Sequence, residues 1–444
     1  MAVILSLIDI LILCMGLFTL AHQLSPATRP GLKGLIAFIT CLSLISYFYY
    51  LSLVFHIGFY SLLGGIALLN VLHLRWSFPL TRRLIGTIRP ALGGFLGSKI
   101  FLALSLSVLV LTVFFSLVVE RWGGWDAWAI WSLHAKFLYY PNSWDHLFTN
   151  KIAFTHPDYP LMLPSVIAFW WRSIGAISPM VPALIAWVVL ITIPLVVFMT
   201  LLRGKLNLVA LASLGIFVAS INYSYLASSQ YADTLLSLFI LVAFVLYREV
   251  DDTQANLIYF VGFAAASAAW IKNEGELFYA AFTFAIICFH LRTPALWLKY
   301  FVGSLLPLAV LASFKLSYAP PNDLLHSGRS ESIKYLLMAA PRYWLIIKMM
   351  TLEFLKGYAI IGVLIVVALV NKLYFFRSFP FVALSTVLAG YFFVYVITPN
   401  DLAWHISSTA DRILHQLFPA TIFLLLNRLM DLSKPAIARS SPPL

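Results

Sequence analysis

Asp126 is the residue whose type and position point most directly to chemistry. It follows Trp125 just beyond a long apolar run, where an ionised carboxylate has little free solvation. Carboxylates in such places are uncommon and usually mark a site, where proton transfer is the chemistry that they typically perform. The structural alternative is a helix N-cap, because Asp favours that position and Gly123-Gly124 precede it. The sequence favours the functional interpretation.

Other ionisable residues stand at the ends of other apolar runs. Lys272 and Glu274 lie two residues apart at the mouth of one run, which indicates a polar pocket, although a structural ion pair is the simpler interpretation. Asp233 opens another run and is either a second site carboxylate or a helix N-cap. His156 and Asp158 lack the HxxxH or HExxH spacing of zinc ligands, so no metal site is expected.

The composition shows which elements must position these residues. The chain has 444 residues, of which 62% are hydrophobic and only 10% are charged, and its mean hydropathy is +0.93. Soluble domains have about 25% charged residues, so a cytosolic enzyme, a disordered protein and a disulfide scaffold are excluded. The net charge of +12 has no basic cluster to carry nucleic-acid binding. Cys14, Cys41 and Cys288 lie inside apolar runs and read as small core residues.

The apolar runs predict an all-α, polytopic bundle of about thirteen transmembrane spans, since about 20 residues cross the hydrocarbon layer. The N-terminus lacks a basic region and a cleavage site, so it is expected to be a retained first span. Asp9, in the middle of that span, is costly in lipid and should face another helix. The predicted spans are residues 2–22, 33–54, 57–74, 98–119, 179–202, 206–226, 232–248, 256–271, 276–291, 300–317, 356–371, 378–397 and 412–428.

The distribution of charge orients these spans. Lys and Arg are dense in the short connections of one side, whereas the long connections 120–178, 318–355 and 398–411 lie on the other side with most of the carboxylates. The positive-inside rule therefore places the N-terminus and the long connections outside and the C-terminal tail inside. The short inner loops leave no room for a site, so the chemistry is expected at the outer face.

The outer loop 120–178 carries most of the functional information. Trp122, Trp125, Trp128 and Trp131 recur every three residues, which predicts that they share one flank of an interfacial helix in an aromatic belt. The apolar stretch 160–171 is too short to span a membrane. It is expected to form a juxtamembrane or re-entrant helix that begins near Pro164 and ends at the turn 172–175.

The order of motifs in this loop and beyond it resembles the bacterial GT-C glycosyltransferases, which are integral-membrane enzymes that use polyprenyl-phosphate-linked sugars. The motifs are Gly124-Trp125-Asp126, His156-Pro157-Asp158-Tyr159-Pro160, Tyr231-Ala232-Asp233, Lys272-Asn273-Glu274-Gly275 and Asp411-Arg412-Ile413-Leu414-His415. The resemblance covers residues 98–428 and implies a GT-C-like catalytic domain there. Family members commonly have one span before the first large loop, whereas four precede it here, so residues 1–97 are an N-terminal addition of unknown role. Residues 429–444 are then a cytoplasmic tail.

The resemblance implies that Asp126 is the essential acid, because the family carries that residue in its first outer loop. A lipid phosphate is already an acidic leaving group, so one carboxylate that removes the acceptor proton suffices, with cations to hold the departing charge. Arg412 is the strongest candidate for that phosphate because it can bind it bidentately, and the alternatives for Arg412 are an interfacial anchor or an ion pair with Asp411. The further phosphate-binding candidates are Arg172, Lys272 and Lys136, and the sugar- or acceptor-binding candidates are Asp158, His156, Tyr159, Asp233, Glu274 and His415.

The expected protein is thus a glycosyltransferase of the inner or plasma membrane, with its active site outside and no cofactor; a divalent cation is not favoured. Its partners would be a polyprenyl-phosphate-sugar donor, a lipid, glycan or protein acceptor, and the bilayer, without nucleic acid. A flippase of lipid-linked sugars is one alternative, but such transporters show internal repeats and midplane charges. An O-antigen-ligase-type transferase is the other, since loop 318–355 is long and carries Arg329, Lys334, Arg342 and Lys348.

Overall fold

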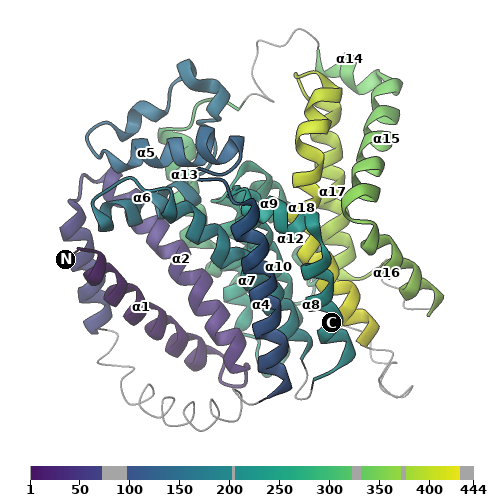
Figure 1. Ribbon diagram of the computed structural model, residues 1–444, viewed down its shortest axis with the longest axis horizontal. Helices are drawn as coiled ribbons and strands as arrows, with labels where there is room; N and C mark the ends of the chain where they lie inside the picture. The colour runs from purple at the N-terminus through teal and green to yellow at the C-terminus, as the bar shows by residue number, and fades with distance from the viewer. Residues whose placement is uncertain (1, 73–97, 203–205, 323–331, 372–376, 431–444) are drawn as a thin grey trace.

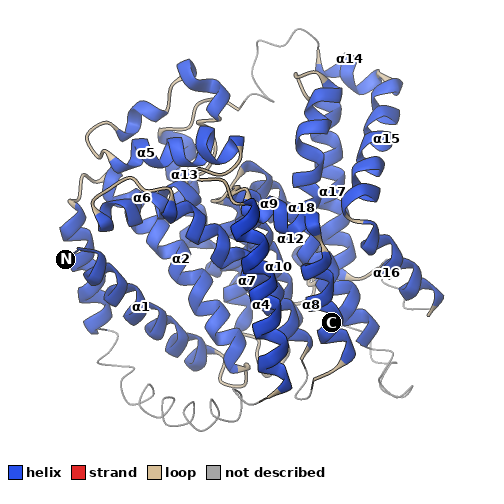
Figure 2. Cartoon of the chain, viewed as in Figure 1, coloured by secondary structure: helices blue, strands red, loops and turns tan. Residues whose placement is uncertain are grey.

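The computed structural model describes residues 2–72, 98–202, 206–322, 332–371 and 377–430 (Figure 1). Within these ranges every regular element is a helix (Figure 2). Arg329 and the C-terminal tail 431–444 lie outside the described residues. The prediction of an all-α protein is therefore confirmed for the described part of the chain.

Seven of the described helices are long and apolar enough to cross a membrane, and up to nine spans result if each of two bent helix pairs counts as one. The seven are α1 (Ala2–Leu24), α2 (Pro30–Val54), α4 (Lys99–Val118), α7 (Met180–Leu201), α13 (Pro294–Ser317), α17 (Phe379–Ile397) and α18 (Leu402–Met430). The bent pairs are α8 (Leu208–Ala219) with α9 (Ile221–Ser228), at 62°, and α15 (Ala340–Gly357) with α16 (Ala359–Val370), at 89°. The chain is a multi-pass helical membrane protein.

Helices also occupy the other predicted spans, but these helices have at most 17 residues, at or below the lower limit of about 17 residues for a span. They are the helix Phe59–Leu72, α10 (Ala232–Arg248), α11 (Leu257–Ala269) and α12 (Asn273–Phe289). A helix that is enclosed by other helices does not need a full apolar length, so length alone does not settle their course. The count of thirteen spans therefore stays a prediction.

Two predicted connections are largely helical. The loop 318–355 contains α14 (Ile333–Met338) and most of α15, and α18 begins at Leu402, well before the predicted start at residue 412. Predicted spans are recognised by a long stretch of high hydropathy, whereas the polar residues in both segments lower their mean hydropathy. Helices α14 and α15 pack against α17, and α15 also packs against α18.

Helix α10 is the centre of the bundle. All of its residues from Ala232 to Tyr247 are buried, against α7, α9, α11 and α18. Its neighbour α11 packs very closely on α13, where a Cβ on Gly262 would lie 2.0 Å from the Tyr300 carbonyl oxygen and one on Gly303 would lie 2.0 Å from that of Tyr259. Only glycine permits this approach of two helix backbones. The charged residues at the ends of α10 and α12 are thereby held on a rigid frame.

The connection after α4 folds over one end of this frame (Figure 1). It contains a single π-helical turn, Ala127–Trp131, followed by α5 (Ser132–Tyr139) and then two 3₁₀ segments, Trp144–Leu147 and Asn150–Thr155. The buried helix α6 (Met162–Ile174) then packs against α5 and α2. As predicted, α6 is a short apolar helix that ends at Gly175, where φ is +78°.

The tryptophan row does not form the single flank that its spacing predicts. Trp125 and Trp128 are each 51% exposed, whereas Trp131 is 1% exposed and lies in the core. The π-helical turn changes the angle between successive residues, so a three-residue spacing no longer keeps side chains on one face. Two of the tryptophans are thus available to a membrane interface, and Trp131 is a core residue.

The N-terminal helices belong to the same hydrophobic core as the rest of the protein. Tyr47 donates a hydrogen bond to Ser267 at 2.8 Å, and Tyr49 donates one to the Leu138 carbonyl at 2.9 Å. Asp9 is buried within the bundle, as expected, and its backbone carbonyl accepts a 2.9 Å hydrogen bond from the Asn70 side chain. The cysteines are free.

Candidate active site

The first feature of the site is an ion pair between Asp126 and Arg412, which are 286 residues apart in the sequence. Asp126 stands at the start of the π-helical turn, and Arg412 lies in α18. The Arg412 guanidinium donates from Nη1 to Asp126 Oδ2, and the two side chains are only 13% and 14% exposed. The tertiary structure therefore brings the predicted base and the predicted phosphate ligand into direct contact.

This geometry bears on the structural alternatives for both residues. Asp126 occupies an N-cap position, but its side chain makes no capping hydrogen bond. The carboxylate that pairs with the Arg412 guanidinium is that of Asp126, whereas Asp411 accepts a 2.8 Å hydrogen bond from the Arg412 backbone N–H. The side-chain geometry of Asp126 thus differs from that of a simple helix cap.

Two glycines allow the Asp126 loop to approach the bundle. Gly123 has φ of +75°, and a Cβ there would lie 2.6 Å from the Ser229 carbonyl oxygen. A Cβ on Gly124 would lie 2.5 Å from the Tyr231 hydroxyl oxygen, and the Gly124 backbone N–H donates to the Ser229 carbonyl at 3.1 Å. Tyr231 also lies under the Arg412 guanidinium, whose carbon is 5.4 Å from the ring centroid. The contact with residues 229–231 therefore holds the Asp126 loop against the bundle, and Tyr231 of that segment also packs against the Arg412 guanidinium.

A second, buried ion pair joins Lys272 and Asp233, and Asp233 also interacts with Arg412. Lys272 Nζ donates to Asp233 Oδ1 at 3.0 Å and forms an ion pair with Glu274 Oε1 at 2.8 Å. Burial disfavours the ammonium, but the Asp233 and Glu274 carboxylates outweigh burial and hold the pKa of Lys272 above its ordinary value. Gln416 donates a second hydrogen bond to Asp233 Oδ1. Removing either partner of such a pair leaves a buried charge uncompensated.

Asp158 occupies a cage of amides on the other side of Lys272. Its Oδ2 accepts hydrogen bonds from the side chains of Asn273, at 2.7 Å, and Asn322, at 2.9 Å. Lys315 donates to the Asp158 backbone carbonyl at 3.0 Å and pairs with Glu276 at 2.8 Å. The end of α13 and the residues that follow it thus contribute to the same region.

Tyr159 connects these two regions through its ring. It stacks on His156, with ring centroids 4.7 Å apart, and on Trp131, with centroids 5.7 Å apart. Lys272 Nζ lies 5.8 Å from the Tyr159 centroid. Burial, reinforced by the nearby carboxylates, raises the pKa of Tyr159 well above its usual range, so its hydroxyl stays protonated.

We refer to these charged residues together as the polar cluster. Its members interact electrostatically across the whole group, and carboxylates outnumber cations in it. The polar cluster consists of Asp126, Asp158, Asp233, Glu274, Glu276, Lys272, Lys315 and Arg412. In the part of the chain that the structure describes, no group of three or more His, Cys, Asp or Glu residues is placed to hold a metal ion.

Three predicted site residues have different surroundings. The Lys136 ammonium is 5.1 Å from the Trp122 centroid, and the Arg172 guanidinium carbon lies 5.7 Å and 5.6 Å from the rings of Phe59 and Tyr139. His415 is fully buried and bonds the Thr234 hydroxyl at 3.0 Å. The contacts of Lys136 and Arg172 are cation–π contacts. His415 is a core residue whose hydrogen-bond partner Thr234 follows Asp233, so it borders the polar cluster.

Sequence reasoning missed Gln416, Lys315 and Asn322 as members of this region. A signal existed for Gln416, because it lies four residues after Arg412 and therefore on the same face of a helix. It also receives a 2.6 Å hydrogen bond from the Tyr391 hydroxyl. Lys315 carried the same signal as Lys272, because it is an ionisable residue near the end of an apolar run, but it was overlooked. Asn322 gave no local signal, since it is uncharged and follows that run.

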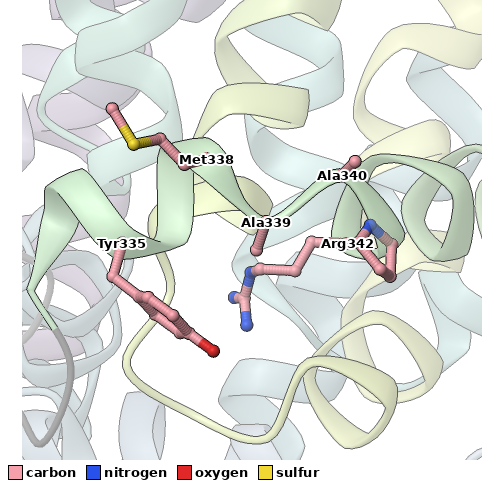
Figure 3. A pocket seen from close by; sticks show the side chains of 6 residues that line it. Tyr335, Met338, Ala339, Ala340 and Arg342 are labelled. Atoms are coloured by element: carbon pink, nitrogen blue, oxygen red, sulfur yellow. The ribbon is translucent and has the colours of Figure 1, made fainter.

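A cavity of about 530 Å³ lies elsewhere, at the junction of α14 and α15 (Figure 3). Its lining residues are Tyr335, Met338, Ala339, Ala340, Pro341 and Arg342. Arg342 donates from Nε to the Val396 carbonyl at 3.1 Å and from Nη2 to the Tyr395 carbonyl at 3.3 Å. None of the lining residues belongs to the polar cluster, so this cavity is separate from the candidate active site.

No family model matches the chain, and neither the curated proteins nor the solved structures that were searched contain a match.

Proposed function

We propose that the chain is a GT-C-type membrane glycosyltransferase that moves a sugar from a polyprenyl-phosphate donor to a hydroxyl group of a lipid, glycan or protein acceptor. The single observation that carries this proposal is the contact between Asp126 and Arg412. A carboxylate able to accept a proton and a guanidinium able to hold a phosphate lie side by side, between the first large connection and the last long helix. By the positive-inside rule, the Lys and Arg residues of the short connections support an outer location for this end of the bundle, in an inner or plasma membrane.

The reaction needs few groups. Asp126 takes the proton of the acceptor hydroxyl while the hydroxyl oxygen attacks the anomeric carbon of the sugar. The bond between that carbon and the phosphate oxygen breaks, and the phosphate leaves with the bonding electron pair. Arg412 stabilises the charge that develops on the phosphate. Since the leaving group needs no proton, a second carboxylate flanking the bond, as in glycosidases, is not required.

The other charged residues of the polar cluster support these two. Lys272 is 5% exposed, and its ion pairs with Asp233 and Glu274 fix the position of Asp233, which also interacts with Arg412. Asp158 lies beside the Tyr159 stack, where a sugar or acceptor hydroxyl would find hydrogen-bond acceptors. We assign donor and acceptor binding to this region, and no residue role in it requires a metal ion or cofactor.

The proposal is tested with purified protein in lipid nanodiscs and a panel of polyprenyl-phosphate sugars. Asp126→Asn keeps the size of the side chain but cannot act as a base, so transfer should fall by roughly 10²–10⁴-fold. Asp145→Asn is the matched control, because it removes an exposed carboxylate of the same connection, and it should retain normal transfer. The measurement is the rate of release of polyprenyl phosphate.

Two results would contradict the proposal. One is the absence of transfer by the wild-type protein from every donor of the panel to lipid, glycan and peptide acceptors. The other is an Asp126→Asn variant that transfers sugar within about threefold of the wild type, because loss of a general base has a far larger effect. Movement of the intact donor across the bilayer of proteoliposomes, without transfer, would instead identify a flippase.

A further inference from the structure

The contact between Asp126 and Arg412 creates a conflict between their roles. In this contact Asp126 Oδ2 already accepts a hydrogen bond from the guanidinium, so that oxygen is not free to take the proton of an acceptor hydroxyl. The guanidinium, in turn, is already neutralised by an anion at the position where a phosphate would bind. Each residue of this pair therefore blocks the other in the structure as it stands.

The hydrogen bonds of Arg412 show how the conflict is resolved. Arg412 donates to Asp126 through Nη1, whereas its buried Nε has no hydrogen-bond partner among the described residues. A phosphate group has several acceptor oxygens and can engage two guanidinium nitrogens at once. A phosphate on the edge that Nε shares with Nη2 would satisfy the donor that the Asp126 carboxylate at Nη1 leaves unpaired, and a buried donor without a partner is costly. It would also bring a second anion to the same guanidinium, and the repulsion between the two anions favours release of the Asp126 carboxylate.

From this arrangement we infer that Asp126 is a placeholder for the donor phosphate, and that the phosphate takes Arg412 and thereby frees Asp126 to act as the base. This inference rests on the proposed function and adds an order to it: the base becomes competent only after the lipid phosphate has bound. Arg412 does not lose its counter-charge in the exchange, because Asp233 interacts with it as well.

The surroundings of Asp126 suit such an exchange. Its side chain keeps 14% of its surface exposed, so a released carboxylate is not stranded in a closed interior. Its backbone is anchored independently of Arg412 through the hydrogen bond from Gly124 to the Ser229 carbonyl. The loop can therefore stay in place while the ion pair opens.

The test is a binding measurement with undecaprenyl phosphate, which is the lipid that remains after transfer whatever the sugar. The wild type, Asp126→Asn, Arg412→Ala and Asp145→Asn are compared in nanodiscs of neutral lipid. If the ion pair is closed for about 90–99% of the time, removing the competing carboxylate should tighten binding by about 10–100-fold. Arg412→Ala should weaken binding by at least about tenfold, and Asp145→Asn should leave it unchanged, which separates competition from general loss of negative charge.

The outcomes distinguish this inference from the proposed function. Tighter lipid binding by Asp126→Asn together with lost transfer supports both. Lost transfer with unchanged or weaker lipid binding overturns the exchange but keeps Asp126 as the base. Normal transfer by Asp126→Asn overturns the proposed function itself. Asp126→Ala, which removes the remaining amide contact, should bind the lipid at least as tightly as Asp126→Asn; weaker binding would also overturn the exchange.

Discussion

The first large connection, residues 120–178, and the later α14–α15 arm, residues 332–357, differ in what their charged residues contact. Both were expected to be long outer loops with charged residues, and both contain helices. In the first connection, Asp126 and Asp158 contact charged or amide groups of other elements, such as Arg412 and Asn273. In the arm, Arg342 contacts backbone carbonyls at the end of α17.

Burial separates the two regions further. The Asp126–Arg412 side chains are 14% and 13% exposed, whereas Lys356 in the arm is 68% exposed in its pair with Glu353. Exposed pairs contribute only about 0–1 kcal/mol, and many contribute nothing measurable. The comparison teaches that the same residue types mark a candidate site only where the fold removes them from water and gives them opposite charges as partners. It also favours the first connection over the arm as the catalytic element.

The largest loss of sugar transfer is expected on substitution of Arg412. Arg412→Ala should reduce transfer by about 10²–10³-fold, because one fixed donor to the developing charge is lost. Arg412→Lys should lose less, since the charge remains while the two-pronged geometry disappears. Transfer rates of both variants are compared with that of Arg172→Ala, whose guanidinium lies over aromatic rings and should tolerate the change. A larger loss in Arg172→Ala than in Arg412→Ala would move the phosphate site away from the polar cluster.

A smaller effect is expected at the turn that holds the loop. A methyl group on Gly124 would lie 2.5 Å from the Tyr231 hydroxyl oxygen, so either the Tyr231 side chain that packs on Arg412 or the loop that carries Asp126 must shift, and Gly124→Ala should lower transfer by about 10–100-fold. Gly215→Ala in α8 is the control, because a Cβ there meets nothing within 4 Å. Both variants should fold, as judged by thermal unfolding in detergent. Equal transfer by the two variants would show that the close approach of the loop is not needed for activity.

The smallest effect on activity is expected in the arm. Arg342→Ala removes hydrogen bonds to the carbonyls that end α17 and should destabilise the protein by about 1–2 kcal/mol, seen as a lower unfolding temperature. Transfer at a temperature where the variant is folded should stay within about twofold of the wild type. A loss of transfer as large as that of Arg412→Ala would instead favour the ligase-type alternative, in which the late loop carries the site.

Several features of the fold were predictable because they depend on local sequence. The apolar runs predicted the helices of the bundle, because hydropathy is a local property. The short apolar stretch before Gly175 predicted α6, because a glycine that can adopt positive φ ends a helix locally. The helical starts of α15 and α18 were missed because polar residues lowered the hydropathy there. The prediction that the four tryptophans share one flank of a helix was wrong, because no sequence rule anticipates a π-helical turn at Ala127–Trp131.

The sequence by itself determined that this protein is an all-α membrane protein, and it identified Asp126, Asp233, Lys272, Glu274 and Arg412 as ionisable residues at the ends of apolar runs. Only the tertiary structure decided which of them are partners. The Asp126–Arg412 pair spans 286 residues and depends on the packing of α18 against α10 and on two glycines that bring the loop to Tyr231. Hydropathy acts residue by residue, whereas the Coulomb energy of a pair depends on distance and burial, which exist only once the chain has folded.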